Sequence, residues 1–250
     1  MGVSSIVLTR DEADNIVACL EGLGWADEVL VFDSGSEDGT VELAAEAGAR
    51  VVTRSFDTYS AQRNAALGLA KQDWVLFVDA DERVSPGLAE EIQEAVGGAV
   101  AGYWIPRKNL IFGRWVRGGG WWPDHQLRLY KRDKGRYDEA RAVHEVVRLE
   151  GPEGYLKTPL LHHNYRSVSQ FREKQRRYTD MAALDLWRQG TRFRAWSPLL
   201  QPWREFRRRY FSLAGYRDGL PGLTLALLLA WYEGLKYARL GRIAAREGAS

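Results

Sequence analysis

The stretch of sequence that decides the fold is residues 4–40, which read SSIVLTRDEADNIVACLEGLGWADEVLVFDSGSEDGT. Two short β-branched runs, at residues 6–9 and 28–34, enclose a segment with helical spacing at residues 12–23. The alternation continues outward with a helical pattern at 41–47, a strand at 50–54, a helical pattern at 60–70 and a strand at 74–79. This alternation predicts an α/β fold with one mostly parallel sheet and helices on both of its faces.

Carboxylate-rich segments follow three of the predicted strands, at residues 9–12 (TRDE), 33–36 (DSGS) and 79–81 (DAD). Ligands of such sheets bind beyond the carboxyl ends of the strands, so we expect the chemistry at these segments. Asp79 and Asp81 supply hard oxygen ligands of the kind that Mg²⁺ or Mn²⁺ takes together with a substrate diphosphate. The fifteen aspartates of the chain would give about one Asp-x-Asp by chance, so a solvated acidic turn with Glu82 is the alternative.

The formal net charge of +2 conceals two halves of opposite sign. Residues 1–100 carry 6 Lys/Arg against 19 Asp/Glu, whereas residues 101–250 carry 29 against 14 and include eight of the ten tryptophans. A basic, aromatic surface suits either nucleic acid or an anionic membrane interface. We expect no nucleic acid to bind, because the acidic half would repel its phosphates and the sequence contains no nucleic-acid motif.

The pattern changes after residue 100. Extended, aromatic segments follow, with a predicted hairpin from residues 126–131 to 136–147. Three consecutive glycines at 118–120 predict either a loop that closes on substrate or a tight bend.

From residue 168 the chain is predicted to be a helical, basic and aromatic-rich extension. Its Arg-rich segment at 203–211 suits an anionic membrane interface, and the alternative is a solvated helix packed on the catalytic domain. The apolar run at 220–232 would be about 20 Å long as a helix, too short for the ~30 Å hydrocarbon core. We expect the predicted helix at 220–237 to meet one leaflet, a partner subunit in a homo-oligomer, or the core.

The single cysteine, Cys19, has no intrachain partner, so we expect no disulfide and a reducing compartment. The chain runs directly into its first strand with no basic segment before an apolar run, so no secretory signal is expected. Together with the basic extension, these features predict a cytoplasmic protein, peripheral on the inner face of the cytoplasmic membrane.

Several motifs occur in a shared order and carry a resemblance. They are residues 9–16 (TRDEADNI), 31–40 (VFDSGSEDGT), 61–66 (AQRNAA), 76–82 (LFVDADE), 120–130 (GWWPDHQLRLY), 143–145 (VHE) and 162–167 (HHNYRS). Over about residues 4–240 the chain resembles family-2 glycosyltransferases with the GT-A fold. The later motifs resemble the subgroup of lipopolysaccharide-core β-1,4-glucosyltransferases.

The resemblance implies a role for each matching residue. Thr9 and Glu12 would contact the nucleoside, Asp33 a uracil-type base, and Arg63 the base or the diphosphate. Asp79 would lie near the ribose and donor sugar and beside the metal. Asp81 would be the main ligand of Mg²⁺ or Mn²⁺, and His162 would approach the metal or the diphosphate.

An inverting transfer needs a general base for the acceptor hydroxyl. In the family this base is an acidic residue shortly after a Gly-Gly-Phe-Asp-Glu-like segment. Here residues 135–139 (GRYDE) precede His144 and Glu145, so Glu145 is the predicted base. Asp124, which follows Trp122-Pro123, is the alternative.

The predicted domains are a GT-A catalytic domain at 1–167, with a nucleotide-binding half (1–100) and an acceptor-binding half (101–167), and the extension at 168–250. The predicted activity is transfer of a hexose, with glucose favoured, from a UDP-sugar to a glycolipid or lipopolysaccharide-core-like saccharide. The alternatives are a nucleotide-sugar hydrolase or nucleotidyltransferase on the same fold, or a module that binds anionic surfaces or nucleic acid.

Overall fold

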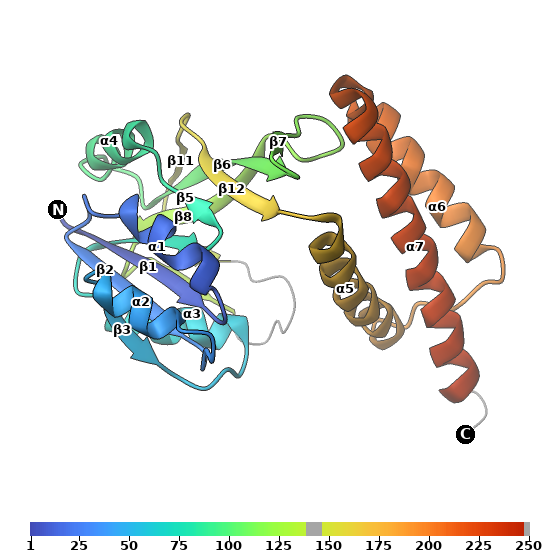
Figure 1. Ribbon diagram of the computed structural model, residues 1–250, viewed down its shortest axis with the longest axis horizontal. Coiled ribbons are helices and arrows are strands. Elements are labelled where there is room, and N and C mark those ends of the chain that lie inside the picture. Colours follow the sequence, from blue (N-terminus) through green and yellow to red (C-terminus); the bar gives the residue numbers. More distant parts are fainter. Residues whose placement is uncertain (139–146, 248–250) are drawn as a thin grey trace. The chain divides into compact units, whose positions relative to one another are not determined.

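The computed structural model describes residues 1–138 and 147–247 (Figure 1). The chain divides into two compact units, one of Met1–Arg107 with His125–His162 and the other of Lys108–Asp124 with His163–Ser250. The chain passes between the units three times, and each time within a strand. These strands are β6 (Gly102–Ile111), β8 (Asp124–Lys131) and β12 (Leu160–Tyr165).

The first unit contains the predicted βαβαβαβ succession. Its strands are β1 (Val3–Thr9), β2 (Glu28–Asp33), β3 (Arg50–Thr53), β4 (Trp74–Asp79), β5 (Glu82–Arg83), β9 (Gly135–Tyr137), β10 (Val147–Leu149) and β11 (Glu153–Tyr155). Its helices are α1 (Ala13–Glu21), α2 (Thr40–Glu46), α3 (Tyr59–Leu69) and α4 (Pro86–Ala95). Side-chain caps define where helices begin: the Thr58 hydroxyl accepts a hydrogen bond from Ala61 N at the start of α3.

Within the described residues, ten strands form one sheet with the order β3-β2-β1-β4-β8-β6-β12-β5, to which β7 and β11 add at β6. Strands β1 to β4 are parallel, and β8 runs antiparallel to β4. Thr9 is in register with Asp33, and Leu8 with Asp79. The carboxyl ends of β1, β2 and β4 are therefore level at one edge of the sheet, as the sequence predicts.

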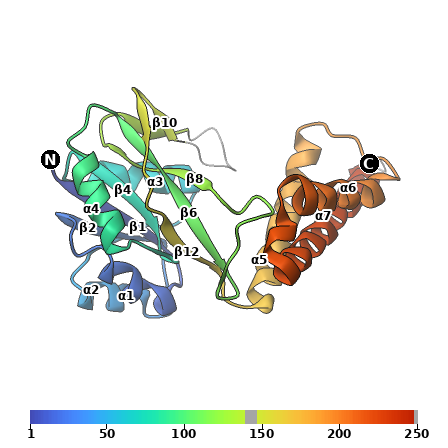
Figure 2. The same cartoon turned by 90° about the horizontal axis from the view of Figure 1, so that it is seen from above.

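Hydrophobic clusters cover both faces of this sheet because alternate residues of each strand point to opposite sides. Val7 belongs to the cluster that includes Leu20 of α1 and Leu88 of α4. Its neighbour Ile6 belongs to the cluster that includes Leu67 of α3. The α/β fold class is thus confirmed, with a sheet between two helical layers (Figure 2).

The predicted hairpin of residues 126–131 with 136–147 is wrong in the pairing of its described strands, and its residues 139–146 lie outside the described part of the chain. Strand β8 lies in the main sheet beside β4, and β9 pairs instead with β10 in a two-stranded sheet. A local pattern shows where strands lie but not which partner they take, because pairing depends on distant residues.

The second unit is helical. Its elements are β7 (Arg114–Trp115), α5 (Val168–Arg188), α6 (Ser197–Arg207), the π-helix η1 (Arg208–Ser212), the 3₁₀-helix η2 (Gly215–Asp218) and α7 (Gly219–Glu247) (Figure 1). The Tyr232 ring of α7 packs on Phe171 of α5 at 6.1 Å, and Arg239 pairs with Asp180 at 2.8 Å. Gly234 of α7 lies against Pro202 of α6, where a Cβ would come within 2.9 Å of the proline ring.

The triple glycine at 118–120 is tightly packed within this unit. The Gly118 and Arg117 amides donate to the Asp218 carboxylate, and the Gly119 amide donates to Leu213 O at 2.8 Å. A Cβ at Gly118 would lie 2.3 Å from Ala214 O. This close backbone approach gives a physical reason for glycine at that position.

Among the helices of the described part of the chain, none has the length and apolarity that crossing a bilayer requires.

Candidate active site

Asp33 and Thr9 join the carboxyl ends of β2 and β1. Thr9 Oγ1 donates to Asp33 Oδ1 at 3.1 Å, and both side chains are buried. The amides of Gly35 and Ser36 donate to Asp33 Oδ2 at 2.8 and 2.9 Å, and the Ser36 hydroxyl donates to Oδ1. The chain's own donors thus occupy the roughly four acceptor positions of this carboxylate. Asp33 therefore fixes the loop after β2.

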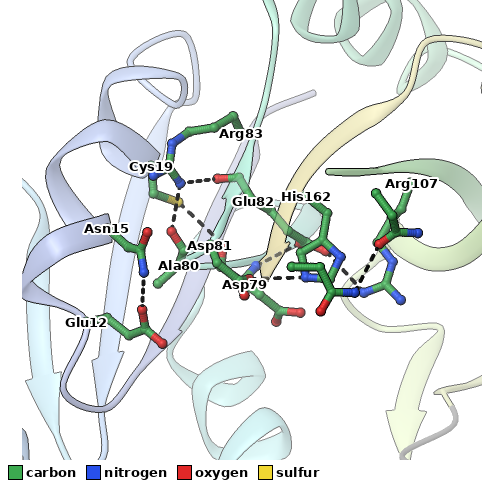
Figure 3. Close-up of polar contacts among 12 residues, drawn as sticks. Glu12, Asn15, Cys19, Asp79, Ala80, Asp81, Glu82, Arg83, Arg107 and His162 are labelled. Atoms are coloured by element: carbon green, nitrogen blue, oxygen red, sulfur yellow. Dashed lines mark hydrogen bonds and ion pairs between the residues drawn. The ribbon is translucent and has the colours of Figure 1, made fainter. Parts of the chain in front are cut away.

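A second set of hydrogen bonds ties the loop after β1 to the loop after β2. The Asp11 amide donates to Ser36 Oγ, and the Glu37 amide donates back to Asp11 Oδ1. The Glu12 amide donates to Thr40 Oγ1 at 2.8 Å, while the Glu12 carboxylate accepts from Asn15 Nδ2 at 2.6 Å (Figure 3). Glu12 is held at the start of α1, on the edge where the sequence predicts nucleoside contacts.

Two arginines hold the Asp79 carboxylate at the end of β4. Arg63 of α3 approaches Oδ1 at 3.2 Å, and Arg128 of β8 contacts both carboxylate oxygens. Burial alone would raise the pKa of Asp79, but Arg128 and Arg63 outweigh that effect and hold the pKa well below its usual range. Asp79 is therefore ionised and already shared between two guanidinium groups.

Glu82, the first residue of β5, follows Asp79 by three residues and is fully buried. Its Oε2 accepts from the Asp79 amide at 2.9 Å, and its Oε1 lies 3.3 Å from Arg128 and 3.4 Å from Arg107. Burial raises the pKa of Glu82, which Arg128 partly counteracts. The alternative of a solvated acidic turn is wrong for this side chain. Glu82 instead belongs to a charge cluster with Asp79, Arg128 and Arg107, of which Figure 3 labels Asp79, Glu82 and Arg107.

Asp81 and His162 face one another across β5 and β12. His162 Nε2 lies 3.5 Å from Asp81 Oδ1, and both side chains are largely buried (Figure 3). They are near one another because His162 of β12 pairs with Glu82 of β5, the residue after Asp81. The residues described here contain no cluster of three or more His, Cys, Asp or Glu arranged to hold a metal. The Asp81 carboxylate still suits a magnesium-type ion, which commonly takes one or two carboxylates plus substrate phosphates.

Cys19 of α1 packs against the backbone of the same region. Its Sγ lies 3.7 Å from Asp79 O (Figure 3). Burial raises the pKa of the Cys19 thiol to about 12. The thiol is therefore a packing group at this site and is protonated at neutral pH.

The two candidate bases are placed differently. Glu145, with His144, lies outside the described residues. Asp124 lies in the second unit, where its Oδ2 accepts from Nδ2 of the fully buried Asn109 at 3.2 Å. The same Asn109 nitrogen donates to Trp121 O at 2.9 Å.

Three charged residues of the cluster are missing from the set predicted by sequence: Glu82, Arg107 and Arg128. Arg128 could have been found because it interrupts the apolar run of β8 between Leu127 and Leu129. A charged side chain that belongs to a buried strand needs a partner, although the sequence does not show which strand supplies it.

Comparison with known proteins identifies the family to which this fold and site belong. The chain belongs to glycosyl transferase family 2, whose family model matches residues 4–146. It is also 30% identical, over 95% of its length and 91% of the relative's, to the lipopolysaccharide core biosynthesis glycosyltransferase LpsC of Rhizobium meliloti. The protein is therefore a family 2 glycosyltransferase, and the family expected from its motifs is confirmed.

Other similarities are shorter or more distant. An uncharacterized glycosyltransferase of Rickettsia bellii is 39% identical over 36% of this chain and 31% of its own length. The crystal structure of S. aureus TarS 1-349 in complex with UDP matches 99% of this chain and 92% of that chain, at 18% identity and a TM-score of 0.49. Glucosyl-3-phosphoglycerate synthase from Mycobacterium tuberculosis, in complex with Mn²⁺, UDP and its product, matches 32% of this chain and 34% of that chain, at 26% identity and a TM-score of 0.30.

Proposed function

We propose that the protein transfers a hexose, with inversion, from a UDP-sugar to a saccharide of a lipopolysaccharide core or a related glycolipid. The observation that carries this proposal is the convergence of Asp79, Asp81 and His162 beside the level ends of β1 and β2. The likeness to a lipopolysaccharide-core transferase over nearly the whole chain supports the acceptor class.

In this proposal the residues of the edge have separate tasks. Thr9, Glu12 and Asp33 form the nucleoside site, with Asp33 acting through the loop that it fixes. Arg63 faces the diphosphate or base, and Asp79 orients the guanidinium of Arg63 toward the donor. Asp81 and His162, with Asp79 next to them, would hold Mg²⁺ or Mn²⁺. When bound, such an ion neutralises the charge that gathers on the leaving diphosphate.

The test of this proposal is UDP binding with and without Mn²⁺, measured by calorimetry. We expect the wild type to bind UDP at least tenfold more tightly with Mn²⁺, and we expect Asp81→Ala to lose that gain, because the diphosphate then meets an acidic edge without a counter-charge. Asp73→Ala is the matched control. Asp73 is an exposed aspartate that immediately precedes the first residue of β4, whereas Asp81 follows the last residue of that strand. The metal site would be contradicted if the wild type bound UDP equally well in EDTA and in Mn²⁺, or if Asp81→Ala bound UDP in Mn²⁺ as tightly as the wild type.

The proposal also assigns the second unit to an anionic membrane surface on the cytoplasmic side. Large apolar side chains are exposed on α6 at the spacing of one helix face: Trp196, Leu199, Leu200 and Trp203, of which Leu199 is 80% and Trp203 60% exposed. On α7, Leu220, Leu227 and Trp231 recur at intervals of seven and four residues and are also exposed. Exposed apolar side chains in such a number are typical of a surface that binds a membrane or a protein partner.

Basic residues accompany this apolar surface. Arg208 and Arg209 pair with Glu205, at 2.8 and 2.5 Å. Arg204 and Arg207 lie in the last turn of α6 and are exposed. Exposed tryptophan beside exposed arginine is the combination that suits the headgroup region of an anionic bilayer.

A further inference from the structure

A cavity of about 310 Å³ lies in the first unit beside the buried charge cluster. Its described lining residues are Arg63, Trp104, His125, Gln126, Leu127, Arg128, Tyr137 and Val147. This volume is in the range of pockets that hold small ligands. The nucleoside residues Thr9, Glu12 and Asp33 are not among the lining residues, so the cavity is separate from that part of the site.

The wall of the cavity is cationic. The side chains of Arg63 and Arg128 are only 11% and 8% exposed, and both line the cavity. Their carboxylate partners Asp79 and Glu82 do not, and no acidic side chain occurs among the described lining residues. Among the described residues of the wall, an anion in the cavity would therefore meet guanidinium groups and no carboxylate.

Arg128 has donor capacity that the protein itself does not use. Its two terminal nitrogens contact Asp79 and Glu82, but its buried Nε has no hydrogen-bond acceptor within the described part of the chain. Buried N–H groups nearly always have an acceptor, and an unpaired one is costly. The Nε atom is itself buried, so it marks an unsatisfied donor beside the cavity and not one exposed within it.

Aromatic rings form the rest of the wall and are held in place. Trp104 Nε1 donates to Glu153 at 2.7 Å, and its ring stacks on Tyr155 at 6.3 Å. The Tyr137 ring packs edge-on against Phe77 at 5.7 Å. Fixed aromatic faces with a few polar groups, here Gln126 and His125, suit the apolar faces and hydroxyl edges of a sugar ring.

We propose that this cavity binds the acceptor saccharide through an anionic substituent, a carboxylate or a phosphate, which the guanidinium groups of Arg128 and Arg63 recognise. The proposal rests on the proposed transferase function and makes it more specific, because it states that the acceptor sugar is charged. It also gives Arg128 a second task besides orienting Asp79.

The experiment compares three probes, glucose, glucuronate and glucose 6-phosphate, by calorimetry on the full chain with UDP and Mn²⁺ present. We expect at least one charged probe to bind tenfold or more tightly than glucose. The two charged probes separate the sources, because a cavity shaped for carboxylate favours glucuronate and one shaped for phosphate favours glucose 6-phosphate. Equal affinity for all three probes would overturn the proposal.

Variants test whether the preference arises at this wall. Arg128→Gln and, separately, Arg63→Gln should each reduce the preference for the charged probe at least fivefold. Two variants are used because Arg128→Gln also removes a partner of Asp79 and Glu82, and Arg63→Gln also removes a proposed donor contact. Calorimetry with UDP and Mn²⁺ alone checks that each variant still binds the donor nucleotide, and circular dichroism checks that each is folded. Arg132→Gln is the matched control, an exposed arginine four residues after Arg128.

Persistence of the charge preference in both folded variants would also overturn the proposal. Failure of this inference is distinguishable from failure of the proposed function. A wild type that binds UDP with Mn²⁺ but does not discriminate among the probes contradicts only the cavity assignment. A wild type that binds no UDP contradicts the transferase proposal itself.

Discussion

At the scale of single residues, the site uses carboxylates in two different ways. Asp33 accepts hydrogen bonds from its own loop and has no acceptor position left over. Asp81, in contrast, faces an imidazole and lies where a cation could join them. The same side-chain chemistry thus builds the loop at one strand end and, in the function proposed above, holds a cation at another.

The assignment of the general base is the first prediction at this scale. If Glu145 takes the acceptor proton, Glu145→Gln keeps UDP and metal affinity while kcat falls by roughly 10²–10⁴, the usual worth of general-base catalysis. The amide keeps the shape of the side chain but accepts no proton at neutral pH. Steady-state kinetics together with calorimetry on the same preparation measures both quantities.

Asp124→Asn is the control for this prediction. The new side chain can still accept from Asn109, so local packing is preserved. If Asp124 only shapes the loop around Trp121, its substitution changes mainly the KM for acceptor. A collapse of kcat in Asp124→Asn, with nearly normal Glu145→Gln, would reverse the assignment.

How far single residues were predictable depends on the range of the contacts that place them. Asp33 and Asp79 could be placed at one edge from sequence, because parallel strands bring their carboxyl ends together. Arg128 could not be placed, because its contact with Asp79 depends on the antiparallel pairing of β8 with β4, about fifty residues apart along the chain. Glu82 was missed because a carboxylate in an acidic turn looks solvated until its two arginine partners are known.

At the scale of elements, the helices and strands of the first eighty residues follow from hydrophobic period alone, and all seven predicted elements are present. The hairpin failed because β9 pairs with β10 and leaves β8 to the main sheet. The close approach of η2 to α7 also had no local signal. There Gly222 lies so near Gly215 that a Cβ would be 2.0 Å from the carbonyl oxygen.

This approach gives a stability prediction. Gly222→Ala should destabilise the protein by about 1–3 kcal/mol, because a backbone atom, unlike a flexible side chain, must move to make room. Gly68→Ala in α3 is the matched control, since a Cβ there has no neighbour within 4 Å. It should instead stabilise by roughly 0.5–1 kcal/mol, the helix-propensity difference. Thermal unfolding of both variants decides, and an unchanged Tm in Gly222→Ala would contradict the close approach.

At the scale of the whole molecule, the charge split of the sequence corresponds to a difference in chemistry between the two units. The acidic first hundred residues supply the sheet edge with its carboxylates, and the segment after residue 168 carries 14 of the 28 arginines. The sequence predicted that contrast correctly, because net charge needs no knowledge of the fold.

Membrane binding is the prediction at this scale. We expect the protein to sediment with phosphatidylglycerol vesicles at low salt and much less at high salt or with phosphatidylcholine. Removing both charges in Arg204→Gln/Arg207→Gln should weaken binding by about thirtyfold, since each basic residue near such a surface is worth roughly 1 kcal/mol.

The control removes two exposed charges from the first unit, in Lys71→Gln/Arg132→Gln. It should leave sedimentation unchanged. Binding that is indifferent to salt and lipid charge, or equally weakened in both double variants, would show that the second unit is not the attachment surface.

The position of Cys19 has a practical consequence for labelling chemistry. The chain has one thiol, and burial both hides it and keeps it protonated at neutral pH, with a pKa of about 12. Toward maleimide dyes or spin labels the folded protein is thus equivalent to a cysteine-free background. A single cysteine introduced at an exposed position, such as Thr224 on α7, would carry the only reactive sulfur, and a fluorescent reporter could be attached there without first altering the packing around Asp79.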